Sequence, residues 1–330
     1  MTISRVATIY NLKLIPGDTR VVFHDYLLSD EISMVEKYLS SPQFVAAIGS
    51  HSHKNLRDNC HFFTTGEIDE KIDILEVSNR GISVLQELTN FLWYIKDNSC
   101  NILNHYTHIP SQGNAVLGIE KNSNFTTCKA TIEEVEFSKD EILKAAEILF
   151  AAHNLATSVK HVSVEDFFKV DGLVNNSGMT SSGMNKIDYG LRNRVERAIL
   201  FMGTVRAAAF IPMKIALGMN VLECLFSDTS SGDIIHKIAE RTAFYIGDST
   251  EDRITSFKLV KDAYNVRSKY FHGQKLDKKE YNASKLEDIS VKTDNLLRRV
   301  LTNVIMVDSA IFTSSDEELS KWFTNLIFKK

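Results

Sequence analysis

Residues 249–273 read STEDRITSFKLVKDAYNVRSKYFHG and carry clear signals for both ends of a helix. Ser249, followed by Thr, Glu and Asp, is typical of a helix start, because a serine side chain can accept a hydrogen bond from the first unpaired backbone N–H groups. Gly273 is typical of a helix end, since glycine adopts the left-handed conformation without a steric penalty. The pattern therefore predicts one helix that runs from Ser249 to His272.

Helical patterns continue on both sides of this segment. Apolar residues recur at helical spacing in four further stretches, 189–210, 213–226, 233–246 and 284–307. Five consecutive helices with short loops are typical of an antiparallel bundle. We therefore expect an all-α domain over residues 187–330. A stretch rich in Gly, Ser and Asn at 171–186 predicts a linker or mobile loop before it.

Residues 1–170 mix strand and helix patterns, so we expect an α+β domain there. The predicted strands are 2–15, 21–28, 102–109, 115–119 and 125–137. The predicted helices are 30–39, 71–97 and 138–158, the last opened by the capping box Ser138-Lys-Asp-Glu141. This domain contains no catalytic motif that we can name, and a sensor or regulatory role is one interpretation.

The charge of the chain is uneven. Its 330 residues carry a net charge of −4, which argues against a general nucleic-acid binder. Between Arg253 and Arg299, however, 12 Lys and Arg residues stand against 6 Asp and Glu residues. This local balance of +6 leaves −10 for the remainder of the chain. The basic segment is compatible with a phosphate-binding surface or with a solvated helix face.

The sequence shows no sign of export or of membrane insertion. Its four cysteines include no C-x-x-C pair, and the N-terminus lacks the basic start and apolar core of a signal peptide. The most apolar stretch, residues 198–226, is interrupted by Arg206, Pro212 and Lys214. We therefore expect two buried helices there rather than a membrane span, and a cytoplasmic protein.

The end of the predicted helix, Tyr264-Asn-Val-Arg-Ser-Lys-Tyr-Phe-His-Gly273, resembles the signature of the HEPN superfamily. That signature is an Arg followed, after four to six residues, by a His. More narrowly, the segment resembles the Apea-like HEPN group, in which Tyr-x-x-Arg-Ser-Lys-x-x-His-Gly is typical. The upstream segments LECLF at 222–226 and IIHKIAER at 234–241 agree with it. The resemblance covers about residues 188–307.

The resemblance implies a HEPN-type antiparallel bundle and a ribonuclease that cuts RNA without a metal or other cofactor. Arg267 and His272 would be the catalytic residues, because arginine can hold two phosphate oxygens and histidine can move a proton near neutral pH. Other positions that match the group are Tyr264, Ser268 and Lys269, as substrate-binding residues, and Glu240, Arg241 and Gly273, as supporting ones. Tyr264 is equally compatible with a core position, and Glu240 and Arg241 with a structural role.

The spacing of the motif also bears on quaternary structure. Five residues place Arg267 and His272 roughly 140° apart around a helix, so one helix cannot present both on one face. In the HEPN superfamily, composite sites form where two motif helices meet. Because the chain has one such motif, we expect a symmetric homodimer. The resemblance suggests a role in phage defence or as a toxin-like effector, together with a partner that senses a trigger or inhibits the nuclease. The alternative is a non-catalytic HEPN module that binds a nucleotide or RNA, or that dimerises.

A second group of chemically active side chains lies in the first half of the chain. His51, His53, Cys60 and His61 fall within eleven residues, but their spacing matches no common zinc motif. We therefore expect a polar loop here and no metal.

Overall fold

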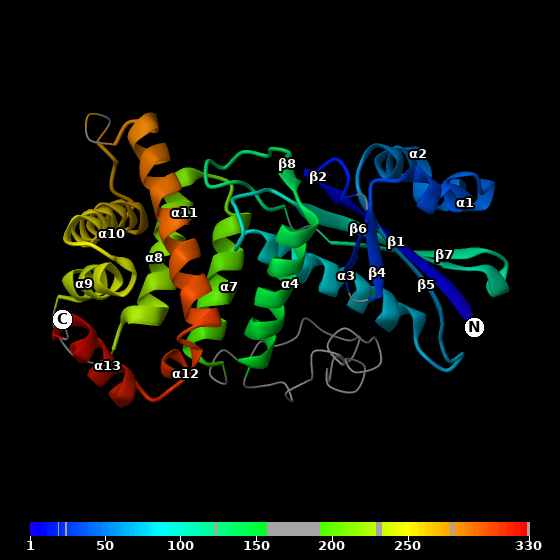
Figure 1. The fold of residues 1–330 in the computed structure, drawn as a ribbon. Coiled ribbons are helices and arrows are strands. Elements are labelled where there is room, and N and C mark those ends of the chain that lie inside the picture. Colours follow the sequence, from blue (N-terminus) through cyan, green and yellow to red (C-terminus); the bar gives the residue numbers. More distant parts are fainter. Residues whose placement is uncertain are drawn as a thin grey trace. The chain divides into compact units, whose positions relative to one another are not determined.

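The computed structural model describes residues 1–18, 20–23, 25–121, 124–156, 192–228, 233–277, 279 and 281–328. This part of the chain forms two compact units (Figure 1). The first contains residues 1–125 and 132–150, and the second contains 126–131, 151–156 and 192–328. The linker predicted at 171–186 lies outside the described residues.

An antiparallel sheet organises the first unit, with the strand order β3-β4-β5-β1-β6-β7. Its strands are β1 (Thr2–Tyr10), β3 (Arg20–Phe23), β4 (Tyr26–Ser29), β5 (His61–Glu67), β6 (Asn101–Ile109) and β7 (Ala115–Glu120). A short parallel pair joins β2 (Leu12–Leu14) to β8 (Val135–Phe137). Strand β1 is central, because β5 and β6 pair with its two edges, and most of its residues are buried.

Helices of the first unit pack on both faces of the sheet. They are η1 (Ile32–Met34), α1 (Glu36–Leu39), α2 (Pro42–Asp58), α3 (Ile74–Leu92) and η2 (Pro110–Gln112), and α4 (Lys139–Asn154) follows β8. Successive strand residues point to opposite faces. Tyr106 accordingly joins the apolar cluster of α1 and α2, whereas Thr107 bonds Ser78 of α3 at 2.6 Å.

A buried polar contact lies between the sheet and α3. The Tyr26 hydroxyl and Nε2 of His105 form a hydrogen bond of 2.7 Å, and the backbone of Gly81 lies directly against both side chains. Burial, with the charges of Arg5 and Lys121, lowers the pKa of His105 to about 3. The imidazole is therefore neutral in the folded protein at neutral pH.

The second unit is helical and is built around one central helix. Its helices are α7 (Arg194–Ala207), α8 (Ile211–Phe226), α9 (Ile234–Ile246), α10 (Thr250–Phe271), α11 (Ala283–Met306), α12 (Ser309–Phe312) and α13 (Asp316–Phe328). Helix α8 packs against α7, α9, α10 and α11, which explains its almost entirely apolar sequence (Figure 1). An α+β region followed by an all-α region, as predicted, is confirmed.

Both predicted ends of α10 are confirmed. Oγ of Ser249 accepts a hydrogen bond from the N–H of Asp252 at 3.1 Å, which starts the helix. At the other end His272 is the C-terminal cap, and Gly273 follows with a φ of +65°. The N–H of Gln274 then donates to the Lys269 carbonyl at 2.8 Å. These contacts satisfy backbone groups that a helix end leaves unpaired.

Three predicted strands differ from the structure. Residues 2–15 form β1 in the six-stranded sheet and β2 in the two-stranded pair, because the chain breaks at Asn11, whose φ is +64°. Residues 21–28 are not one strand, because they belong to the antiparallel pair of β3 and β4, in which Phe23 pairs with Tyr26. Of residues 125–137, only Val135–Phe137 is a strand. Residues 126–131 belong to the second unit, where the N–H of Thr126 donates to the Arg206 carbonyl at 2.9 Å.

The helices that were not predicted include α2, α12 and α13. His51 and His53 lie on α2 rather than in a polar loop; Ser41 caps that helix and Pro42 occupies its first turn. Helix α13 extends the bundle beyond the five predicted helices. Of the helices that the structure describes, none is both long and apolar enough to cross a membrane.

Candidate functional site

Arg267 lies on the face of α10 that packs against α8. Its guanidinium donates from Nε to Oδ1 of Asn220 at 3.2 Å and forms an ion pair with Oε2 of Glu223 at 2.9 Å. Nη1 also donates to the Tyr264 hydroxyl at 3.1 Å, and the guanidinium lies 4.9 Å from the centre of the Tyr264 ring. Helical side chains lean towards the N-terminus of their helix, so Arg267 reaches back along α10.

His272 lies at the opposite end of the motif and is exposed. Its backbone N–H bonds the Ser268 carbonyl at 3.1 Å, but its imidazole has no hydrogen bond or ion pair within the described part of the chain. Within the described residues, no hydrogen bond or ion pair joins the Arg267 and His272 side chains.

A polar pocket of about 510 Å³ opens beside Arg267. Helices α7, α8, α10 and the start of α13 line it with Arg194, Arg197, Phe201, Asn220, Glu223, Cys224, Ser227, Asp228, Arg267 and Asp316. Three guanidinium groups and three carboxylates therefore nearly balance in charge. Arg194 pairs with Asp316 and donates to the last carbonyls of α8, so it stabilises the fold.

Glu223 is the important residue here that sequence reasoning missed. It precedes Arg267 by 44 residues, and only the packing of α8 against α10 brings the two together. A signal was present, because Asn220 and Glu223 are three residues apart and therefore share one face of an otherwise apolar helix.

Three motif residues were predicted to bind substrate. Tyr264 is buried, which agrees with the core interpretation, and burial followed by the Glu223 carboxylate raises its pKa. Lys269 places its ammonium 4.5 Å from the centre of the Tyr281 ring. Ser268 is half-buried, and its carbonyl accepts the bond from the His272 N–H.

The three residues that were predicted to have a supporting role differ in their contacts. Arg241 is buried, donates to the Phe226 carbonyl at 2.7 Å and pairs with Asp228 at 2.6 Å, so it fixes the C-terminal end of α8. Glu240 is half-buried and makes no hydrogen bond or ion pair in the described part of the chain. Gly273 has the positive φ that the helix end requires.

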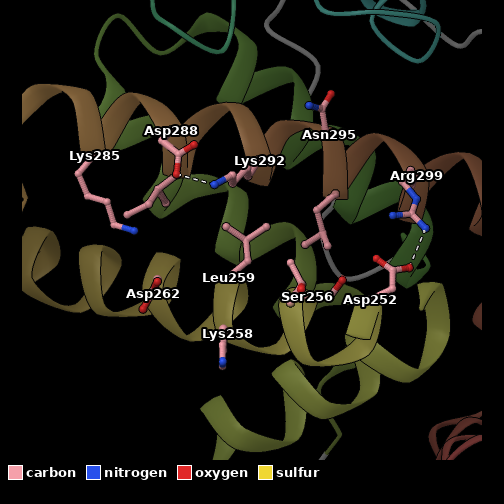
Figure 2. Close-up of a pocket in the computed structure, with 13 residues that line it drawn as sticks. Asp252, Ser256, Lys258, Leu259, Asp262, Lys285, Asp288, Lys292, Asn295 and Arg299 are labelled. Atoms are coloured by element: carbon pink, nitrogen blue, oxygen red, sulfur yellow. Dashed lines mark hydrogen bonds and ion pairs between the residues drawn. The ribbon is translucent and has the colours of Figure 1, made fainter. Parts of the chain in front are cut away.

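The basic segment lines a groove of about 390 Å³ between α10 and α11 (Figure 2). Figure 2 shows two ion pairs in this groove. Lys292 pairs with Asp288 of the same helix at 2.7 Å, and Arg299 of α11 pairs with Asp252 of α10 at 3.6 Å. These pairs neutralise part of the positive charge that the composition indicates. Lys285 and Asp262, which also line the groove, have no ion pair within the described residues.

No protein-family model, curated protein or solved structure matches the chain.

Proposed function

We propose that the helical unit is a metal-independent ribonuclease of the HEPN type that acts as a homodimer. The observation that carries this proposal is the exposed imidazole of His272 at the end of α10, which makes no hydrogen bond or ion pair within the described residues. A histidine in that position is accessible to a substrate, and the carbonyl end of a helix favours a nearby cation. Such a group can donate a proton to a leaving oxygen.

The chemistry would use a nucleophile that RNA itself supplies. The 2′-hydroxyl loses its proton to water as its oxygen attacks the adjacent phosphorus, the bond to the 5′-oxygen breaks, and a protonated His272 donates its proton to that oxygen. Arg267 would hold the phosphate. Because Arg267 already forms an ion pair with Glu223, the phosphate must compete with that carboxylate for the guanidinium. The products are a 2′,3′-cyclic phosphate and a 5′-hydroxyl.

A second copy of the chain would complete the site. Phe210 and Phe271 are 45% and 53% exposed, and Tyr270 contacts Phe210 at a ring-centroid distance of 5.8 Å. These aromatic residues form an apolar surface beside His272. Apolar surface of this kind is stabilised when another protein surface covers it. A two-fold contact here would bring two copies of the motif together.

One observation favours a second candidate, a non-catalytic module that binds a nucleotide or RNA, or that dimerises. The guanidinium of Arg267 is already bonded to Asn220, Glu223 and Tyr264 of its own chain. In this alternative the Arg267 contacts only stabilise the bundle.

The experiment that separates the two candidates is incubation of the full chain with end-labelled RNA in EDTA. We expect cleavage that leaves cyclic phosphate ends, no cleavage of DNA of the same sequence, and complete loss in His272→Ala. His51→Ala is the matched control, because it removes an exposed helical histidine from the other unit. Binding without cleavage would favour the second candidate. Cleavage that requires Mg²⁺ or leaves 5′-phosphates would refute the proposed chemistry.

A further inference from the structure

Strand β7 lies at one end of the six-stranded sheet, and one of its two edges is open. Its neighbour is β6, and the register runs from Ala115 opposite Ile109 to Glu120 opposite Asn104 without a bulge. Within the described part of the chain, no strand pairs with the other edge of β7. An open edge presents a row of backbone N–H and C=O groups, and only another extended chain can bond all of them at once.

A hydrogen bond just beyond the strand shows which groups face the open edge. The N–H of Lys121 donates to the carbonyl of Leu103 in β6 at 2.9 Å. In an antiparallel pair, residues that bond the neighbouring strand alternate with residues whose N–H and C=O point away from it. Every second residue before Lys121 therefore bonds β6. The backbone groups of the residues between them, Val116, Gly118 and Glu120, face the open edge.

The two outer strands of the sheet differ in how they are protected against pairing. Natural edge strands are commonly short, or carry charged residues or proline. Strand β3 follows this rule, because it has four residues and begins with Arg20, which pairs with Glu31 at 2.7 Å. Strand β7 has six residues, contains no Lys, Arg or Pro, and carries its one charge at its end, on Glu120. The edge of β7 is therefore the one that is open to a partner.

The side chains of β7 determine what an added strand would carry. Leu117 and Ile119 are half-buried on the face of the sheet that α3 covers, so apolar side chains beside them would complete that surface. On the other face Gly118 is exposed, and a Cβ there would meet only the Tyr106 ring, at 3.3 Å. An aromatic side chain fits beside that ring. Glu120 is exposed and has no ion pair within the described residues, so it favours a basic neighbour.

We propose that the first unit binds an extended segment of another protein as an additional strand on β7. The segment runs antiparallel to β7 and carries an aromatic residue opposite Gly118, Lys or Arg opposite Glu120, and β-branched apolar residues on the face towards α3. A second copy of the chain fits less well, because β7 itself contains no basic residue for Glu120. The inference does not rest on the proposed ribonuclease, since the Arg–His motif lies in the other unit.

Titration of the full chain with the capped synthetic peptide Lys-Val-Tyr-Val-Thr tests the inference. Paired antiparallel, its Lys lies opposite Glu120 and its Tyr opposite Gly118. We expect a Kd below about 1 mM. Methylation of the Tyr nitrogen, which faces β7, should weaken binding at least about 10-fold, because it removes a backbone hydrogen bond and adds a clash. Methylation of the first Val nitrogen, which points away from β7, is the matched control and should leave the Kd unchanged.

The charge of the peptide and the position of its binding are measured separately. Replacing the peptide Lys by Glu should weaken binding about 2- to 5-fold, the range of an exposed ion pair. Amide hydrogen exchange, followed by NMR, should slow at Gly118 and Glu120 when the peptide binds. The amides of Leu117 and Ile119 should keep their exchange rates, because they are already bonded to β6.

A variant of the protein tests the same edge. Glu120→Pro removes an N–H that faces the open edge and should abolish peptide binding without removing a hydrogen bond to β6. Glu120→Gln is the matched control, since it keeps the N–H and loses only the charge. If Glu120→Pro does not fold, the two methylated peptides decide the question by themselves.

Four results would overturn the inference. They are the absence of peptide binding at about 1 mM, equal effects of the two methyl groups, unchanged binding by a folded Glu120→Pro, and slowed exchange at residues outside β7 only. Exchange at Gly118 and Glu120 that slows with protein concentration in the absence of peptide would also overturn it, because a second copy of the chain would then occupy the edge.

Discussion

Replacing Arg267 by alanine should lower the stability of the helical unit, whereas replacing His272 by alanine should not. Glu223 and the Arg267 side chain are each 23% exposed, so their ion pair is stronger than a surface pair but is still reached by solvent. The mutation also leaves Asn220 without its donor. We expect a loss of about 1–2 kcal/mol in the free energy of unfolding. That loss corresponds to a fall of about 3–8 °C in Tm.

His272 has no comparable contacts, and its truncation should change the free energy of unfolding by less than about 0.5 kcal/mol. Thermal unfolding of the two variants beside Arg57→Ala, which removes an exposed arginine from α2, measures the difference. A cycle with Glu223→Gln isolates the pair, and we expect a coupling of about 1 kcal/mol. Wild-type stability in Arg267→Ala, or zero coupling, would refute the ion pair as described. A fall of several degrees in His272→Ala would make that residue structural.

Three further predictions concern other parts of the protein. The pKa of His105 lies near 3 in the folded state and near 6.5 in the unfolded state, so its contribution to stability is full above pH 6.5. Below that pH the free energy of unfolding should fall by up to about 1.4 kcal/mol per pH unit towards pH 3. The fall should be less steep in His105→Gln, and denaturant titration of both proteins at pH 7, 6 and 5 checks this. Gly81→Ala should destabilise the first unit by about 1–3 kcal/mol, because the added Cβ would lie 2.5 Å from the Tyr26 hydroxyl. An unchanged denaturation midpoint would contradict that close approach. Light scattering should find a dimer for the wild type and a monomer for Phe271→Glu; a wild-type monomer that still cleaves RNA would exclude a composite site.

The positions of individual helices could be predicted because the relevant contacts are local. Ser249 caps α10 through a residue three positions away, and Ser138 and Glu141 form the predicted capping box at 2.9 and 3.2 Å. Gly273 ends the helix through its own backbone conformation. Each of these signals acts within one turn, so the residue types alone indicate where a helix begins or ends.

The surroundings of the motif could not be predicted in the same way. Glu223 meets Arg267 across 44 residues, and Asp228 meets Arg241 between two helices. Such pairs depend on the angle and register at which helices pack, which many apolar contacts determine together. The sequence alone therefore indicated an α+β region, a helical region and an Arg–His motif at a helix end. Only the tertiary structure decided that Arg267 is bonded within its own chain while His272 is left exposed, because the helix surface that Arg267 covers is created by the packing of α8.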